Sequence, residues 1–358
     1  MKKLKSIQKF QIIVLRSHNW GLIMIKFENI NKYILFGGSI ILLDFAVYLK
    51  NSCKDVVVYS SERHLNEPIK SGITLQQLLE VECIHFYSVP DINKELINTD
   101  DVIGISFGAP WVFKKEFIER FNGRLLNCHG TRLPYYRGGG GHSWRIMRGN
   151  RLGNCLLHLV NTGIDTGDIV FQKSFYYPVS CRKPIDYDDY YHDKVLKFLA
   201  EFVSNVSNGH SFEPVKQQDI FSTYYPRLNT KEHGFIDWSW DIKDIESFIC
   251  AFDEPYPGAS TFLDGIRLII KDVLTDFNDG AFHPFQTGII YRITEDSVFV
   301  ACKGGSLVIK KIINEDGSNA IKHLKLGDRL HTPLCKLEAA MMIRQKYTSH
   351  GIGGHESN

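Results

Sequence analysis

Short apolar runs alternate with helical periodicity through the first half of the chain. An apolar run at residues 33–36 ends in two glycines, apolar positions at helical spacing follow over 40–49, and a second apolar run occupies 55–59. Strand, glycine turn, helix and strand in this order open a doubly wound α/β sheet. Further apolar runs that predict strands lie at 85–87, 101–106, 124–127, 155–160 and 169–175. Helical periodicity predicts covering helices over 75–81, 111–121 and 187–205.

The pattern changes after residue 208. Residues 208–226 are rich in polar and turn residues, which is typical of a connector. Short apolar runs separated by Gly, Asp and Asn turns then follow at 260–263, 267–271, 288–293, 297–301 and 306–312. Several short strands at regular spacing predict a smaller, mainly antiparallel, barrel-like β domain. A closing helix over 334–347 and a mobile tail over 349–358 are expected.

These patterns divide the 358 residues, which are enough for two domains that each bury a core. The predicted units are an N-terminal extension (1–24), an α/β domain (25–212), a linker (213–226), the small β domain (227–332) and a C-terminal helix with its tail (333–358). The first 23 residues are either a loosely attached extension or the product of an upstream start codon.

Composition and charge narrow the classes of function. The chain is 44% hydrophobic with a formal net charge of +2, so nothing biases it strongly toward nucleic acid or a membrane. Its eight cysteines form no CxxC pair and no His cluster has zinc-ligand spacing, so no metal is expected. Reduced, scattered thiols fit a cytoplasmic location. The pair Gly37-Gly38 lacks the third glycine of a dinucleotide fingerprint and predicts only a tight turn.

Polar side chains suited to group transfer gather after two predicted strands. Asn127 and His129 are two residues apart at a strand end and therefore point to the same side, whereas Cys128 alternates away and is a poor candidate nucleophile. Asp165 lies in a loop between Gly163 and Gly167. In open α/β sheets the ligand crevice lies beyond the carboxyl ends of the strands. An amide and an imidazole there can stabilise an oxyanion, and a carboxylate beside the imidazole supports proton transfer from an amine.

Two segments resemble the signature of the 10-formyltetrahydrofolate-dependent formyltransferases, the family that includes methionyl-tRNA formyltransferase. They are NCHGTRLPYYRGGGG at 127–141 and HLVNTGIDTGDIV at 158–170. Segment 107–117 is similar to the family's folate-pocket segment, and 234–261 to the start of its C-terminal domain, so the resemblance covers roughly 30–330. It implies a Rossmann-like formyltransferase domain followed by the small β domain.

The resemblance also implies roles for individual residues. The catalytic residues would be Asn127, His129 and Asp165. Contacts to the cosubstrate 10-formyltetrahydrofolate would come from Phe107, Gly108, Ala109, Trp111, Val112, His158, Thr162, Gly163, Ile164 and Asp168. Contacts to the acceptor would come from Arg132, Tyr135, Tyr136, Arg137, Gly138, Gly139 and Tyr224. The chain departs from the family pattern at 130–133 and 140–141, which flank the acceptor and leave the amine open.

The acceptor is the least determined part of the prediction. Residues 60–79 lack the density of basic residues that the family's tRNA-binding insertion carries, which argues against tRNA. Another branch of the family formylates nucleotide-linked amino sugars for surface polysaccharides such as O-antigen and lipopolysaccharide, and is commonly homodimeric. Aromatic residues that suit a nucleotide base lie at Tyr135, Tyr136, Trp144, Tyr224, Tyr225, Trp238 and Trp240, although core packing is expected for most of them. Arg132 or Arg137 could pair with a diphosphate.

The leading hypothesis is therefore an N-formyltransferase acting on a dTDP-, UDP- or GDP-linked amino sugar. Methionyl-tRNA is the main alternative acceptor. Another small amine, such as a hydroxylated ornithine, and a non-catalytic folate-binding module also remain open.

Overall fold

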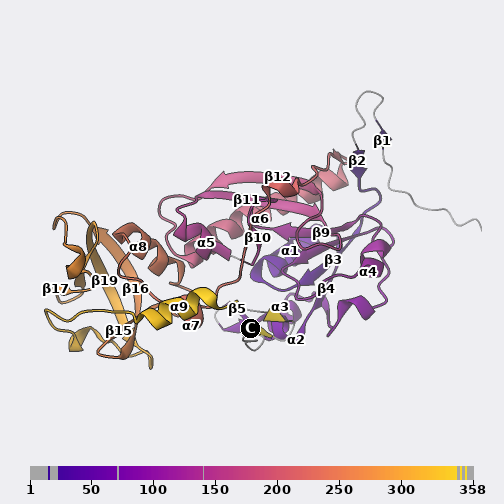
Figure 1. The fold of residues 1–358 in the computed structure, drawn as a ribbon. Helices are drawn as coiled ribbons and strands as arrows, with labels where there is room; N and C mark the ends of the chain where they lie inside the picture. Colours follow the sequence, from indigo (N-terminus) through magenta and orange to yellow (C-terminus); the bar gives the residue numbers. More distant parts are fainter. Residues whose placement is uncertain are drawn as a thin grey trace, which may run out of the picture.

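The computed structural model describes residues 15–16, 23–70, 72–139, 141–344, 347–348 and 351–352. Figure 1 shows two sheets side by side, the larger one at the right and the smaller one at the left. The larger sheet has seven strands in the order β12-β11-β9-β8-β3-β4-β7. Their bounds are β3 (Lys32–Gly37), β4 (Asp55–Ser60), β7 (His85–Ser88), β8 (Val102–Phe107), β9 (Leu125–His129), β11 (Leu152–Leu159) and β12 (Ile169–Tyr176).

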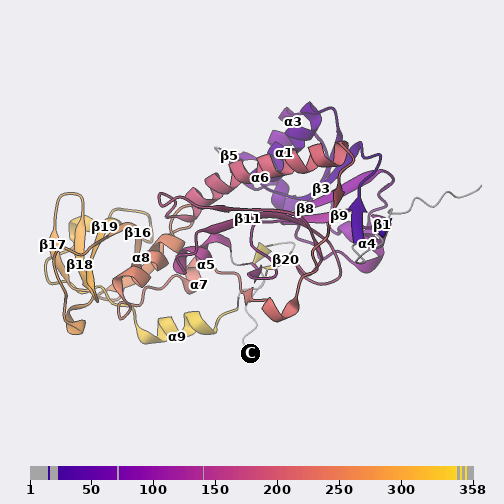
Figure 2. The same ribbon diagram turned by 90° about the horizontal axis from the view of Figure 1, so that it is seen from above.

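The strand directions give the larger sheet its doubly wound character. Five neighbouring strands run parallel: β7, β4, β3, β8 and β9. At one edge, β11 is antiparallel to β9, and β12 is antiparallel to β11. Helices α1 (Ile40–Asn51), α3 (Leu75–Val81) and α6 (Pro184–Ser207) lie on one side of the sheet (Figure 2). Alternate residues of β3 enter different apolar clusters, Tyr33 and Leu35 in one and Ile34 and Phe36 in the other. Helix α4 (Lys115–Arg120) supplies Phe117 to the second cluster, so both faces are covered.

The smaller sheet is antiparallel and partly closed. It contains β15 (Ala259–Leu263), β16 (Ile266–Asp276), β19 (Gly305–Asn314), β18 (Val298–Cys302) and β17 (Ile290–Ile293), in this spatial order. Residues 329–331 join its two edges: the Phe262 N–H donates to the His331 carbonyl at 2.9 Å, and the Leu330 N–H donates to the Gly288 carbonyl at 2.8 Å. The predicted fold class, a Rossmann-like α/β unit followed by a barrel-like antiparallel unit, is confirmed.

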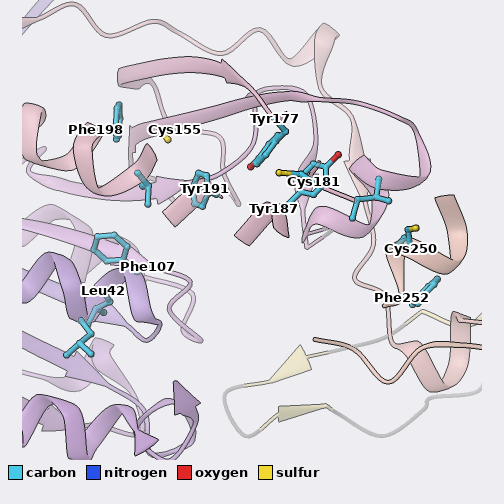
Figure 3. Close-up of a cluster of buried hydrophobic side chains, with 14 of the residues drawn as sticks. Leu42, Phe107, Cys155, Tyr177, Cys181, Tyr187, Tyr191, Phe198, Cys250 and Phe252 are labelled. Carbon is cyan, nitrogen blue, oxygen red and sulfur yellow. The ribbon is translucent and has the colours of Figure 1, made fainter. Parts of the chain in front are cut away.

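A continuous apolar core connects the two units. Figure 3 shows Phe107 and Leu42 from the larger unit, a group of tyrosines beside Cys181, and Cys250 and Phe252 from the smaller unit, all members of one buried cluster. Helix α8 (Ile242–Ala251) contributes Cys250 and packs against both α5 (Gly141–Met147) and β16. Neither α5 nor α8 was predicted as a helix from periodicity. The boundaries proposed for the individual domains remain predictions.

Two predicted helices are shorter than expected. α4 begins at Lys115 rather than at residue 111, because Trp111 is tied down by its indole N–H donating to the Pro90 carbonyl at 3.0 Å, and the Lys114 N–H donates to the Asn93 side chain at 2.7 Å. The C-terminal helix α9 spans Leu334–Met342 and ends before residue 347. Within the part of the chain that the structure describes, no helix is both long and apolar enough to cross a membrane.

The predicted connector is structured along its length. β13 (Ser211–Phe212) pairs with β2 (Ile23–Lys26), and β14 (Tyr224–Tyr225) pairs with β10 (Arg137–Gly138). Residues 213–226 pass the edge strand β12, where Val215 bridges to Ile169, and we call these residues the strap below. Of the predicted extension, 15–16 and 23–24 belong to strands β1 and β2, and the rest lies outside the described residues. The same holds for the predicted tail, of which only 351–352 are described.

Candidate active site

The site lies where the strand order reverses. In the sheet, β3 has β4 on one side and β8 on the other, and open α/β sheets usually bind their ligands beyond the carboxyl ends of two such strands, in the crevice expected here. Gly37 has a φ of +108°, and a Cβ atom there would lie 2.3 Å from the Phe107 carbonyl oxygen. A glycine is therefore required for the two strand ends to approach this closely. β9, next to β8, ends in His129 at the same edge.

Four polar side chains converge at this edge. Asn127 and His129 come from alternate positions of β9, and His158 lies directly opposite Asn127 on β11. Asp165 follows in the 161–168 loop with a φ of +54°. The Asn127 amide nitrogen lies 3.1 Å from His158 Nε2 and donates to Asp165 Oδ1 at 3.4 Å. His129 Nδ1 is 3.8 Å from the same carboxylate oxygen.

The hydrogen bonds fix the roles of the ring nitrogens. His158 Nδ1 lies 2.8 Å from the Leu159 carbonyl oxygen, which only accepts, so Nδ1 carries a proton. His158 Nε2 lies 3.1 Å from the Asn127 amide nitrogen and 3.6 Å from Asp165 Oδ1, so the Asn127 amide is bonded to both His158 and Asp165. Donation by Asn127 to an oxyanion, the role predicted for it, requires one of these two bonds to be released.

Burial and charge set the protonation states of His129 and Asp165. Burial lowers the pKa of His129 below its ordinary value, and the nearby His158 and Arg145 lower it further. The Asp165 carboxylate raises this pKa but does not outweigh the effect of burial. His129 is therefore neutral at pH 7. Its Nε2 is buried and has no hydrogen-bond partner among the described residues. Burial raises the pKa of Asp165, but hydrogen bonding by His158 and the nearby His129 outweigh it, so the carboxyl pKa is lowered.

The strap holds the Asp165 loop in place. The Gln217 side-chain amide donates to the Asp165 carbonyl at 2.9 Å and to the Gly167 carbonyl at 2.7 Å. Its oxygen accepts from Arg137 Nη2 at 2.9 Å, and the same guanidinium nitrogen pairs with Asp219 at 2.9 Å. Arg137 thus has partners within the protein, and its side chain is only 12% exposed; its predicted contact with a diphosphate stays a prediction.

The residues predicted to contact folate are of two kinds. The side chains of Phe107 and Trp111 are buried in apolar clusters. Val112 and Ile164 are exposed large apolar residues, at 68% and 67%. Gly108 and Ala109 continue from the end of β8, whereas Thr162, Gly163 and Asp168 belong to the Asp165 loop. The structure brings these loops to the same edge of the sheet, and their contacts with folate remain predictions.

The residues predicted to contact the acceptor surround β10 and the strap. The Arg132 guanidinium lies over the Tyr135 ring at 5.3 Å, and Tyr136 stacks on Tyr225 at 5.8 Å. Tyr224 is 69% exposed. A Cβ atom added at Gly138 would collide with Tyr225 of the strap. A Cβ atom added at Gly139 would collide with Arg227, just after the strap. The segment can therefore approach the strap only because it is glycine-rich.

Sequence reasoning missed three residues beside the site and correctly discounted others. Gln217, Arg145 and Arg148 belong to no sequence motif that marks them as functional. The three-residue spacing of Arg145 and Arg148, which puts them on one face of a helix, was the signal available in the sequence. Trp238 and Trp240 are core residues, as expected. Cys128 is turned toward Tyr191, and burial raises the pKa of its thiol, which does not suit a nucleophile.

Comparisons with known proteins agree with this geometry. The family pattern described as "Formyl transferase" matches residues 98–179, and "Formyl transferase, C-terminal domain" matches residues 229–323. A methionyl-tRNA formyltransferase of Citrifermentans bemidjiense is 30% identical over 263 residues, which are 72% of this chain and 75% of that protein.

Solved structures share the fold at lower identity. An N-formyltransferase from Helicobacter canadensis, in complex with folinic acid and dTDP-3-aminofucose, superposes with a TM-score of 0.61 at 20% identity, covering 79% of this chain and 99% of that one. A 4-N formyltransferase from Francisella tularensis gives a TM-score of 0.56 at 17% identity, covering 68% of this chain and 98% of that one.

Proposed function

The chain belongs to the formyl transferase family and is a formyl-transferring enzyme, and from this premise we propose that it transfers the formyl group of 10-formyltetrahydrofolate to a nucleotide-linked amino sugar. The proposal includes the surface-polysaccharide role expected above, in the cytoplasm and as a homodimer. The observation that carries it is the neutral, buried His129 beside Asp165, with Nε2 left without a partner among the described residues.

Formyl transfer to an amine sets two requirements that the site meets. The attacking nitrogen must lose a proton, and the carbonyl oxygen needs hydrogen-bond donors as negative charge develops on it. With Nδ1–H facing Asp165, His129 Nε2 is a lone-pair acceptor that takes the amine proton. The Asp165 carboxylate then stabilises the imidazolium, and Asn127 offers an amide N–H to the oxygen once one of its present bonds is released. As the bond between the formyl carbon and the folate nitrogen breaks, the imidazolium returns the proton to that nitrogen, and tetrahydrofolate leaves.

The crevice also fits the folate cosubstrate, which supplies the activated formyl group. Val112 and Ile164 expose apolar surface on the two loops that flank the catalytic residues, and the flat benzene ring of the cosubstrate gains free energy by covering such side chains. The cluster contains imidazole, amide and carboxylate groups, and no group of three or more His, Cys, Asp or Glu side chains that could hold a metal ion occurs in the described part of the chain.

The choice of a sugar acceptor rests on the charge of residues 60–79. This segment contains two basic residues, Arg63 and Lys70, against two acidic ones, Glu62 and Glu67. Burial and the nearby Arg63 and Arg227 lower the pKa of His64 to about 4, so His64 adds no positive charge at pH 7. A segment of zero net charge is poorly suited to gripping the phosphates of tRNA.

Methionyl-tRNA is the second candidate acceptor, and a specific observation favours it. The relative that is 30% identical over most of both chains is a methionyl-tRNA formyltransferase, whereas the solved sugar N-formyltransferases share only the fold at 20% identity or less. If tRNA is the acceptor, its phosphates must be bound by a surface other than residues 60–79.

The decisive experiment supplies both acceptors with 10-formyltetrahydrofolate. Purified protein is incubated with dTDP-, UDP- and GDP-linked amino sugars, with charged methionyl-tRNA and with a hydroxylated ornithine, and mass spectrometry detects any formylated product. We expect a formylated sugar, abolished by His129→Gln but retained by Cys128→Ala, whose side chain lies on the opposite face of the same strand. Formylation of methionyl-tRNA alone would refute the sugar assignment, and folate binding without any product would indicate a non-catalytic module.

A further inference from the structure

A shallow hollow that opens to solvent lies beside helix α5, near the catalytic strand β9. Its walls include Tyr136, Trp144 and Tyr225, together with Arg145 and Arg148. The hollow begins next to the catalytic strand, because Arg145 Nη2 donates to the carbonyl of Gly130 at 3.3 Å and Gly130 follows His129 in the chain. No acidic residue is found among the described residues that line it.

Arg145 is a buried cation without a counter-ion in the described chain. The residue is only 8% exposed, and its Nη1 atom is buried with no hydrogen-bond partner among the residues described. Its surroundings are the Gly130 carbonyl and the ring of Tyr177, whose centroid lies 5.1 Å from the guanidinium carbon; Figure 3 shows this tyrosine among the other buried tyrosines. A guanidinium does not deprotonate in proteins, so burying it unpaired costs free energy that an entering anion offsets.

A second guanidinium faces the same hollow. Arg148 lies over the rings of Tyr136 and Tyr225, at 5.1 and 5.5 Å from their centroids. It follows Arg145 by three residues, so the two side chains lie on one face of the helical turn. Together they bring two positive charges to a hollow with aromatic walls.

We propose that this hollow binds the diphosphate of the acceptor substrate, with Arg145 as its main ion-pair partner, and so places the acceptor's amine at His129. The inference rests on the proposed function and extends it to a binding site. Two guanidiniums match the charge of a diphosphate, whereas a single carboxylate, such as that of an amino acid, would leave one of them unpaired. Phosphoryl oxygens also accept the paired N–H bonds that a guanidinium offers.

The test uses inorganic pyrophosphate and dTDP as probes, without folate or catalysis. Thermal unfolding and calorimetric titration are compared for the wild type, Arg145→Met and Arg145→Lys. Arg267→Met is the matched control, because Arg267 also lies over an aromatic ring, that of Phe235, but in the smaller unit. We expect both probes to bind and stabilise the wild type and the control, and to bind Arg145→Met at least about tenfold more weakly. Arg145→Lys should bind both probes with intermediate affinity, because lysine keeps the positive charge but lacks the paired N–H donors of the guanidinium.

The outcomes separate this inference from the proposed function. Pyrophosphate and dTDP that bind Arg145→Met as tightly as the wild type would overturn the inference, as would a hollow that binds free methionine or ornithine but neither phosphate probe. A formylated amino sugar with an unchanged KM in Arg145→Met would also overturn it while leaving the proposed function intact. Arg145-dependent binding of both probes without formylation of any amino sugar would support the site and refute the sugar function.

Discussion

Gln217 is predicted to control catalysis from outside the reacting atoms. Its side chain is buried and donates to the carbonyls of Asp165 and Gly167, at 2.9 and 2.7 Å, while accepting from Arg137. Replacement by leucine preserves much of the volume and removes all of these hydrogen bonds. The change therefore releases the loop that carries the catalytic carboxylate without touching that carboxylate.

The expected magnitude follows from the two lost bonds. A buried acceptor left without its donor costs about 1–3 kcal/mol, so the two carbonyls that lose Gln217 weaken the loop by about 2–6 kcal/mol. A displacement of about 1 Å at a reacting group costs about 10²-fold in rate, which is about 2.7 kcal/mol. We therefore expect Gln217→Leu to lower kcat/KM by about 10²-fold.

The assay is the pH profile of kcat/KM, since a purely structural defect would lower the profile without moving it. The Asp165 carboxylate raises the pKa of His129 against the effect of burial, so moving Asp165 away lowers that pKa further. The acidic limb of the profile should then shift to lower pH. Gln218→Leu, the same change at the exposed neighbouring position, is the control. Activity within about twofold of the wild type with an unmoved acidic limb would refute the role given to Gln217.

Other predictions address the same elements. Asp165→Asn should lower kcat/KM by at least about 10²-fold, since the imidazolium loses its carboxylate; near-normal turnover would exclude Asp165 from proton transfer. Because burial lowers the pKa of His129, wild-type kcat/KM should persist below pH 6.5 and fall only as the pH drops through the lowered pKa, which initial rates between pH 5 and 8 measure. Gly167→Ala should abolish activity, since its Cβ would lie 1.7 Å from the Leu159 carbonyl oxygen; a crystal structure with an unmoved loop would contradict this. His64, whose pKa is lowered to about 4, should contribute about 3 kcal/mol above pH 6.5 that is lost as the pH falls toward 4, and denaturation of His64→Gln at pH 7 and 4.5 should show less of this loss than the wild type.

The elements that local spacing determines were accessible from the sequence. The predicted strands at 33–36 and 55–59 lie within β3 and β4, and the one at 101–106 overlaps β8 from residue 102 onward. Alternation on β9 places Asn127 and His129 on one side, and the antiparallel register of β11 then sets His158 opposite Asn127. Their meeting with Asp165 follows from strand geometry, although their roles remain predictions.

Features that depend on distant partners were not accessible. The sequence offers Arg132 or Arg137 as a partner for a diphosphate but does not reveal the partners of Arg137 within the chain. Its guanidinium bonds to Gln217 and Asp219, about 80 residues further along the chain. Arg145 resembles an ordinary helical arginine until packing removes water and counter-ions from it. Local patterns contain no information about such partners.

The same contacts couple the acceptor segment to the catalytic carboxylate. The backbone N–H of Gly138 is hydrogen-bonded to Asp165 and lowers its pKa, and the adjacent Arg137 reaches the Asp165 loop through Gln217. Tyr136, in the same segment, lines the hollow in which we place the diphosphate. A ligand that orders this segment therefore also fixes the position of Asp165 relative to His129. Binding energy from a remote part of the acceptor is then used to align the proton-transfer pair, so an amine without that part should lose kcat as well as affinity.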